Sequence, residues 1–249
     1  MSSPLRRPPD DFASPGTAPI PGDNPRAAAV VRAMFDRVAP TYDLLNRLMT
    51  LRVDQSWRGR LLRELDPRPG EVLLDLCAGT MDVAALARDR VPGLRIVGVD
   101  FSLRMLRRGV EKTGLPAAQA DALALPFSTA AFDLATVTFG MRNLESYEQG
   151  LSEVARVLRP GGRLGVLEFF RPQARAARFV HHAYNRLALP VLGRLLSPDP
   201  SAYRYLVDSM ERFAARPEFE ASARRAGFRD VHGETLFPGV CGLVTAVRA

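Results

Sequence analysis

Cysteine is scarce in this sequence of 249 residues, which contains only Cys77 and Cys241. Two cysteines are too few for a disulfide framework or for a zinc site built from thiolates. We therefore expect a reducing, cytoplasmic compartment and no metal centre. Long apolar runs are also missing, so the sequence predicts no membrane-spanning helix. The first 25 residues lack the apolar central run of a secretory signal.

Lysine is rarer still: Lys112 is the single example among 34 basic residues. A coding bias toward arginine accounts for the missing lysines, but not for the net charge of +7. Residues 169–198 contain arginines and many apolar residues but no acid. Such a segment can lie on anionic lipid with its apolar side down. Alternatively, it is an amphipathic cover helix whose arginines face water. Nucleic acid is not expected as a partner, because aromatic and basic residues do not interleave as they do in single-strand binders.

The order of the predicted elements indicates one α/β domain, 27–249, after a short tail. Residues 1–26 are rich in proline and glycine without periodicity, which predicts a disordered tail. Residues 27–66 have helical spacing, interrupted at Pro40, and form a predicted N-terminal helical cap. Apolar strands then alternate with helices, which predicts a mostly parallel sheet covered on both faces. The expected strands are 71–76, 94–99, 117–120, 132–139 and 163–169, with helices ending near 89, 112 and 158.

The C-terminal part is expected to add a cover and a sheet edge. Residues 170–215 form a predicted helical cover over the substrate or against the membrane. Pro160-Gly161-Gly162 predicts a turn before the strand at 163–169. A helix over 218–226 ends at Gly227, a C-cap signal. Two strand-like runs, 228–236 and 240–247, then predict an antiparallel pair at the edge of the sheet.

The strongest local signal is an apolar strand that enters the small residues Cys77-Ala78-Gly79-Thr80 and then a helix. Ligands of open parallel sheets bind at this edge, where a helix start also offers free N–H groups. Two cofactor classes fit: dinucleotides and S-adenosylmethionine. The dinucleotide fingerprint requires G-x-G-x-x-G, whereas only Gly79 stands in this loop. The pattern therefore favours S-adenosylmethionine.

Three acids that follow three predicted strands support the same cofactor. Asp100 is placed to accept both hydroxyls of a ribose. Asp121 could recognise adenine. Asp75 would sit badly beside a diphosphate, but it suits a cofactor with an ammonium group. The alternative is that all three acids are helix caps or surface turns.

Several motifs together resemble class I S-adenosylmethionine-dependent methyltransferases: the loop above, D-A-L-A-L-P-F at 121–127 and R-V-L-R-P-G-G-R at 156–163. Narrower matches resemble the menaquinone/ubiquinone C-methyltransferase family. They are F-D-R-V-A-P-T-Y-D-L-L-N at 35–46, F-G-M-R-N at 139–143, V-L-E-F at 166–169 and Y-R-Y-L at 203–206. The resemblance runs from about residue 30 to the C-terminus. It implies a Rossmann-like class I methyltransferase fold: a mostly parallel seven-stranded sheet with an antiparallel C-terminal edge pair and helices on both faces.

The family resemblance also implies an activity and a cofactor site. The implied reaction moves a methyl group from S-adenosyl-L-methionine to a ring carbon of a prenylated quinol, either demethylmenaquinol or a methoxy-benzoquinol. By motif position, the cofactor site would be lined by Thr80, Asp100, Asp121, Ala122 and Thr138. The expected location is cytoplasmic, at the inner face of the membrane, where anionic lipid is a candidate contact. A homodimer is a further candidate assembly.

Methylating a carbon requires an electron-rich ring, so the enzyme must align the ring and stabilise phenolate-like charge. Arg142 is the first candidate for that stabilisation, with Asn143 orienting it or a ring oxygen. The alternative for Arg142 is a structural ion pair with the loop. Tyr42, Tyr203 and Arg204 are candidates for contact with the ring oxygens, or else core or lid residues. His181 and His182 are weaker candidates for a base.

Two positions depart from the family pattern. The family usually has glycine where Met81 stands, and a side chain there would crowd the methionine end of the cofactor. A histidine is common in the family where Asp54 precedes Trp57.

Two other functions stay open. One is a methyltransferase that acts on another lipid or natural product. The other, motivated by Met81, is a weakly catalytic cofactor-binding subunit.

Overall fold

The computed structural model describes residues 25–50, 52–172, 200–237, 239 and 241–249. Most of the predicted tail therefore lies outside the described residues, as do the basic segment at 173–198 and both histidines expected there, His181 and His182. Within the described part, the first helix begins at Pro25, two residues before the predicted start of the helical cap at 27. Proline suits this position because the first turn of a helix has no use for its N–H group.

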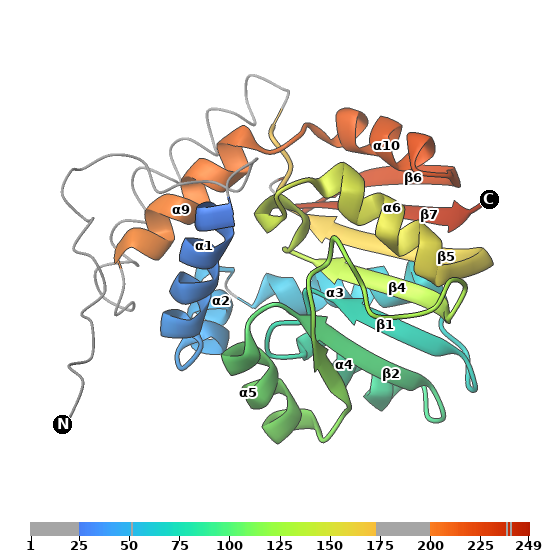
Figure 1. The fold of residues 1–249 in the computed structure, drawn as a ribbon, viewed down its shortest axis with the longest axis horizontal. Helices are drawn as coiled ribbons and strands as arrows, with labels where there is room; N and C mark the ends of the chain where they lie inside the picture. The colour runs from blue at the N-terminus through green and yellow to red at the C-terminus, as the bar shows by residue number, and fades with distance from the viewer. Residues whose placement is uncertain (1–24, 51, 173–199, 238, 240) are drawn as a thin grey trace, which may run out of the picture.

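A seven-stranded sheet forms the centre of the described structure, with strand order β3-β2-β1-β4-β5-β7-β6 (Figure 1). The first five strands are parallel, and β7 runs antiparallel to both β5 and β6, as predicted. Parallel pairing explains why these strands read as nearly continuous apolar runs, since both faces are covered. The strands are β1 (Val72–Leu76), β2 (Arg95–Asp100), β3 (Ala117–Gln119), β4 (Phe132–Thr138), β5 (Leu158–Glu168), β6 (Phe228–Leu236) and β7 (Cys241–Arg248).

Helices cover both faces of the sheet, and each face has its own apolar core. Leu73 of β1 faces a core shared with α3 (Val53–Leu65) and α4 (Asp82–Arg90). Leu74 and Leu76 face the opposite core, together with α6 (Tyr147–Val157) and α10 (Arg216–Arg225). Figure 1 shows α6 in front of the sheet and α3 and α4 behind it. This alternation follows from the two-residue period of a strand.

The helix that follows β2 begins where the sequence predicts. Helix α5 runs over Leu103–Thr113, and the Ser102 side chain caps it by accepting a hydrogen bond from the backbone N–H of Met105 at 3.2 Å. A serine at this position satisfies one of the N–H groups that the first turn leaves unpaired.

Two predicted boundaries are wrong. Pro160-Gly161-Gly162 is not a separate turn, because β5 runs from Leu158 to Glu168 and absorbs these residues in a register shift against β4. Gly161 has a φ of +75°, and a Cβ on Gly162 would lie 2.8 Å from a backbone oxygen. Helix α10 begins two residues before the predicted Glu218, because the carboxylate of Glu218 accepts a hydrogen bond from the N–H of Ala215.

Four helices gather at the carboxyl edge of the sheet, and the three longer ones lie at the left of Figure 1. They are α1 (Pro25–Val38), α2 (Tyr42–Met49), α9 (Pro200–Arg212) and the short 3-10 helix η1 (Met141–Asn143) that follows β4. The break between α1 and α2 falls at residues 39–41, as Pro40 predicts. Val31 and Met34 of α1 pack against Tyr205 of α9. None of the described helices is both long and apolar enough to span a bilayer.

Candidate active site

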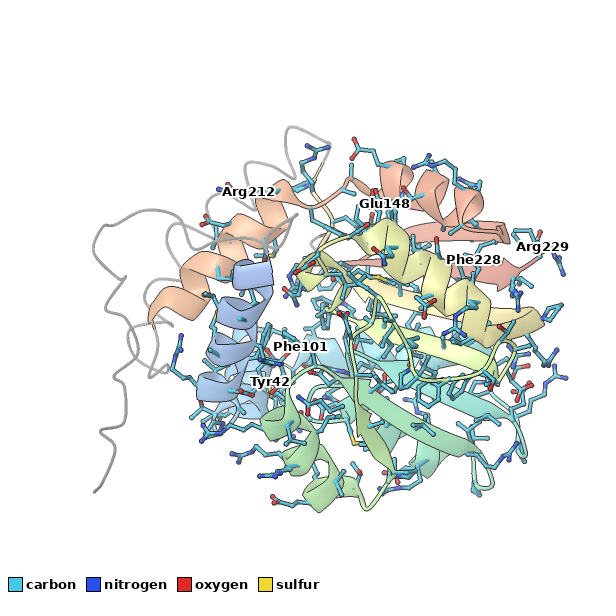
Figure 2. The ribbon with its side chains drawn as sticks, viewed as in Figure 1. Tyr42, Phe101, Glu148, Arg212, Phe228 and Arg229 are labelled. Atoms are coloured by element: carbon cyan, nitrogen blue, oxygen red, sulfur yellow. The ribbon has the colours of Figure 1, made fainter. Side chains whose placement is uncertain are left out.

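A cavity of about 400 Å³ opens at the carboxyl ends of the strands, beneath α1 and α2. Its volume lies in the range of small-molecule sites. Phe101, at the end of β2, and Tyr42, at the start of α2, both line it and both pack edge-on against Phe35. Figure 2 shows Tyr42 and Phe101 close together at this end of the sheet. Seven of the predicted site residues line the cavity: Tyr42, Gly79, Asp100, Asp121, Ala122, Thr138 and Asn143.

Asp100 is the buried acid of this cavity, with 7% of its surface exposed. One carboxylate oxygen accepts a hydrogen bond from the N–H of Gly79 at 2.9 Å, and the other accepts one from the N–H of Ser102 at 2.8 Å. Burial raises the pKa of Asp100 to about 6, although these backbone hydrogen bonds act in the opposite direction. The ionised carboxylate has about four lone-pair sites, more than its backbone donors occupy, so it can also accept a hydrogen bond from a ribose hydroxyl.

The loop between β1 and α4 has a left-handed backbone at three positions. The φ angles are 54° at Cys77, 54° at Gly79 and 62° at Met81. Such angles cost energy outside glycine and tend to occur at functional loops. A Cβ on Gly140 would lie 2.3 Å from the Cβ of Cys77, so this loop and the one after β4 touch across the site. Burial raises the pKa of the Cys77 thiol well above its usual value, which agrees with a role as a small loop filler.

Asp75 does not reach the cavity. Its carboxylate is 1% exposed and accepts hydrogen bonds from the Thr136 hydroxyl at 2.8 Å and the Ala84 N–H at 3.3 Å. The side chain points to the face of the sheet that α4 covers, so it cannot meet an ammonium group in the cavity. Burial raises the pKa of Asp75 to about 7. The prediction of a direct cofactor contact is therefore replaced by a role in fixing the start of α4.

Met81 does not crowd the cavity either. Its side chain is fully buried, and it is not among the residues that line the cavity. It fills the space above two glycines: a Cβ on Gly98 would lie 2.7 Å from the Met81 methyl, and a Cβ on Gly109 would lie 2.6 Å from its Cγ. The expected clash with the methionine end of the cofactor is therefore absent, and so is the reason to expect a weakly catalytic subunit.

Thr80 lies behind the cavity wall rather than on it. It is 3% exposed, and its hydroxyl donates a hydrogen bond to Asp43 of α2. At the opposite side of the cavity, Asp121 is exposed at the rim and accepts a hydrogen bond from the Leu123 N–H at 2.9 Å. Ala122 is buried and Thr138 is half-buried on the wall. The rim of the cavity therefore carries an exposed carboxylate at Asp121, next to a wall of packed side chains at Ala122 and Thr138.

Arg142 and Asn143 occupy the 3-10 turn after β4, but they face different surroundings. Arg142 is buried in an ion pair with Glu168 at the end of β5 and does not line the cavity. Its guanidinium also donates to the carbonyl of Phe139 at 2.8 Å and lies 5.6 Å from the centre of the Phe169 ring. The sequence left open that Arg142 forms a structural ion pair, and the structure shows one. The partner is Glu168 of β5 rather than a residue of the loop after β1.

Asn143 does line the cavity, and two contacts fix its amide. The Tyr205 hydroxyl donates to the amide oxygen at 2.9 Å, and the amide nitrogen donates to the Phe139 carbonyl at 3.2 Å. Tyr205, which is 3% exposed, thus supports the site from α9, a role the sequence did not reveal. The predicted substrate contacts Tyr203 and Arg204 lie on the same helix, but their side chains are outside the described part.

Trp57 and Asp54 are not at the cavity. Trp57 packs against Phe139 and Phe169, and its indole N–H donates to the carbonyl of Phe237 at 2.8 Å. Asp54 is 1% exposed and forms a buried ion pair with Arg58. Both residues therefore serve the packing of α3 against the sheet.

The match to a family model covers nearly the whole described chain. Residues 24–248 match the model of the ubiE/COQ5 methyltransferase family. The chain belongs to this family. The match confirms the family, the enzyme class and the S-adenosylmethionine cofactor that the sequence motifs implied.

Two curated relatives illustrate the similarity. A demethylmenaquinone methyltransferase of Thermus thermophilus is 45% identical over 215 residues, which are 84% of this chain and 97% of the relative. A ubiquinone/menaquinone biosynthesis C-methyltransferase UbiE of Syntrophotalea carbinolica is 42% identical over 224 residues, covering 88% and 94% of the two chains.

Solved structures agree on the fold. A S-adenosylmethionine-dependent methyltransferase of Thermotoga maritima, described as a possible histamine N-methyltransferase, has a TM-score of 0.66 at 20% identity and covers 87% of this chain and 99% of its own. The [4+2]-cyclase SpnF has a TM-score of 0.67 at 18% identity and covers 92% and 98%. These likenesses confirm the Rossmann-like methyltransferase architecture.

Proposed function

We propose that this protein transfers a methyl group from S-adenosylmethionine to a ring carbon of a prenylated quinol, with demethylmenaquinol as its first substrate. The observation that carries the proposal is the 45% identity, across 84% of the chain, to a demethylmenaquinone methyltransferase. The cavity at the carboxyl edge supports it, because its acids suit the cofactor and its other wall is aromatic and apolar.

The residues of the cavity fit the cofactor. When bound, S-adenosylmethionine supplies an electrophilic methyl group on a sulfonium. Asp100 would accept the ribose hydroxyls through oxygens that the N–H groups of Gly79 and Ser102 already orient. Asp121 lies at the rim, where its carboxylate would accept a hydrogen bond from the exocyclic amino group of adenine. Gly79 faces the cavity without a side chain, so the loop backbone approaches the ligand closely.

The quinol ring lies on the side of the cavity formed by Tyr42 and Asn143. Burial raises the pKa of the Tyr42 phenol, so it stays protonated and donates a hydrogen bond to a ring oxygen. Tyr205 and the Phe139 carbonyl hold the Asn143 amide in place. Its second N–H is left to donate a hydrogen bond to a ring oxygen. Donors fixed in advance would stabilise the phenolate that forms when the ring hydroxyl loses its proton, which is the electron-rich form of the ring that methyl transfer needs. The transfer would break the methyl–sulfur bond, release S-adenosylhomocysteine and end with loss of the proton of the methylated carbon to water.

Arg142 acts as a positioning residue. Its side chain is 7% exposed and paired with the fully buried Glu168, so it contacts the backbone and aromatic rings around the cavity rather than the ring oxygens. The pair fixes the turn that carries Asn143. Its positive charge also lowers the pKa of Tyr42 and Tyr205, which partly offsets the effect of burial on both phenols.

The prenyl tail of such a substrate resides in a bilayer, so we infer that the enzyme meets it at a membrane surface. The net charge of +7 supports contact with anionic lipid on the cytoplasmic side. Phe169 and Phe170 pack into the core, so the later part of the acid-free segment, 173–198, is the part of the sequence suited to this contact.

The reaction is tested with purified protein, methyl-labelled S-adenosylmethionine and a mixture of reduced short-chain demethylnaphthoquinol and methoxy-benzoquinol. Mass spectrometry reports which ring gains a carbon-bound methyl group. We expect label on the naphthoquinol, and its loss in Asp100→Ala. Label on the benzoquinol instead would assign the methoxy-benzoquinol as the substrate. Label on neither ring, with confirmed cofactor binding, would exclude a quinol and direct the search to another lipid acceptor.

A further inference from the structure

Two aspartates of the N-terminal helices contact the loops that follow β1 and β2, which the proposed function assigns to the cofactor. Asp36 lies near the end of α1, and its carboxylate accepts a hydrogen bond from the Ser102 hydroxyl at 2.6 Å. Asp43 lies in the first turn of α2, and its carboxylate accepts one from the Thr80 hydroxyl at 2.5 Å. Neither hydroxyl belongs to the helices. Each comes from the loop that follows a central strand.

The contact of Asp36 leads directly to the acid of the cavity. Ser102 is fully buried and donates its backbone N–H to Asp100 at 2.8 Å. The same residue therefore touches Asp36 with its hydroxyl and Asp100 with its N–H. Arg104 adds a weaker link, because its guanidinium donates to the carbonyl of Asp36 at 3.4 Å. Moving α1 away would remove a charged partner from the turn that orients Asp100.

The contact of Asp43 leads to the other cofactor-binding loop. Thr80 follows Gly79, whose backbone faces the cavity and donates to Asp100. The second oxygen of Asp43 lies 3.1 Å from the ammonium group of Lys112, which also pairs with Asp82 at 2.7 Å. The single lysine of the chain thus connects α2 to the start of α4 and the end of α5.

Helices α1 and α2 also form part of the cavity wall, through Arg32, Phe35 and Tyr42. A cofactor in the cavity therefore meets the helices on one side and the loops at Gly79 and Asp100 on the other. From this arrangement we propose that Asp36 and Asp43 are positioning residues that couple the docking of α1 and α2 to cofactor binding. Coupling of this kind is reciprocal: the docked helices strengthen cofactor binding, and the cofactor strengthens docking by the same factor. The proposal rests on the cofactor assignment but not on the quinol.

A double-mutant cycle tests whether Asp43 acts through Thr80. We would measure the dissociation constant of S-adenosylhomocysteine by titration calorimetry for the full chain, Asp43→Ala, Thr80→Val and the double variant. We expect Asp43→Ala to weaken binding about tenfold, and the double variant to bind within twofold of Thr80→Val alone. If the two losses multiply, or if Asp43→Ala binds like the unchanged protein, the proposal is overturned.

Conservative variants separate positioning from general folding. Asp36→Asn and Asp43→Asn keep an oxygen that accepts from Ser102 or Thr80, so we expect each to recover most of the affinity lost in the alanine variant. Asp89→Ala is the matched control, because Asp89 is an exposed acid on α4 that pairs with the adjacent Arg88. Its binding should stay within twofold. An asparagine variant that folds but binds as weakly as alanine would overturn the role of the accepted hydrogen bond.

Hydrogen exchange gives a readout of docking itself. We expect saturating S-adenosylhomocysteine to slow amide exchange in α1 and α2 at least fivefold in the unchanged protein, and less than twofold in Asp36→Ala/Asp43→Ala. If the ligand does not change amide exchange in α1 and α2 of the unchanged protein, the coupling is overturned. These measurements use no quinol, so a protein that binds the cofactor but methylates neither ring would leave this inference intact.

Discussion

The guanidinium of Arg142 and the carboxylate of Glu168 form an ion pair that is almost completely buried, with 7% and 0% of the two side chains exposed. The pair joins the turn after β4 to the end of β5. The carboxylate also accepts backbone N–H groups from Phe169 at 2.8 Å and from Arg142 at 3.3 Å. Its position beside Asn143 links the stability of this edge of the sheet to the shape of the cavity.

Breaking this pair on one side should be more harmful than removing both partners. Glu168→Gln leaves a buried guanidinium without its counter-charge, and we expect a loss of about 3–5 kcal/mol in the free energy of unfolding. Arg142→Met/Glu168→Met buries apolar groups instead and should be less destabilised than Glu168→Gln. Urea denaturation measures both. A double variant that is less stable than the single one would contradict the buried-pair interpretation.

Cofactor affinity should fall in mild acid because of Asp100. Burial raises the pKa of this carboxyl to about 6, so the ionised form that accepts ribose hydroxyls is lost as the pH falls below that value. At pH 5 about one molecule in ten carries the ionised form, so the dissociation constant of S-adenosylhomocysteine should rise about tenfold between pH 7.5 and pH 5. Titration calorimetry measures it. Asp100→Asn should bind weakly with little pH dependence, and the same steep dependence in that variant would assign the titration to another group.

Asp75 should make the protein less stable as the pH rises through 7. Its pKa is raised from 3.8 to about 7 in the folded protein, so the folded state binds more protons than the unfolded state between these values. The free energy of unfolding therefore increases as the pH falls, by about 1.4 kcal/mol from pH 8 to pH 6 for this residue alone. Urea denaturation at the two pH values should show a smaller difference in Asp75→Asn. An unchanged difference would mean that Asp75 titrates at its ordinary value.

The sequence predicted the strands, their alternation with helices and the antiparallel edge pair. These features are marked by apolar runs, turn residues and the Ser102 cap, which are signals between residues close together in the chain. The same signals located Asp100 at a strand end, where parallel strands present their ligands. The directions of side chains were harder to predict. Asp75 lies one residue before the end of β1, whereas Asp100 is the last residue of β2. The two-residue period of the strand therefore turns Asp75 toward α4 and away from the cavity.

Contacts between distant residues were beyond the sequence motifs. Glu168 pairs with Arg142 across 26 positions, and Tyr205 supports Asn143 across 62. Both lie in motifs that the resemblance had singled out, but a motif does not say which of its members touch. The roles of Asp36 and Asp43 were hidden for the same reason, since their partners come from loops after β1 and β2.

Met81 provides the clearest test of sequence against structure. The resemblance suggests that a side chain at this position crowds the cofactor, whereas the structure buries it between Gly98 and Gly109. We therefore expect Met81→Gly to leave the dissociation constant of S-adenosylhomocysteine within twofold. Its free energy of unfolding should fall by about 2–4 kcal/mol, because the lost packing outweighs the relief of a left-handed backbone.

The two glycines allow a matched control for the position of Met81. A Cβ on Gly109 meets atoms of Met81 at 2.6 Å, so Gly109→Ala should destabilise the protein by overpacking, by about 1–3 kcal/mol. In the Met81→Gly background the same alanine enters vacated space, and its cost should vanish or change sign. Thermal and urea unfolding of the four proteins measure this coupling. Equal costs of Gly109→Ala in both backgrounds would mean that the Met81 side chain does not contact Gly109. A gain in cofactor affinity in Met81→Gly would mean that the Met81 side chain does crowd the cavity.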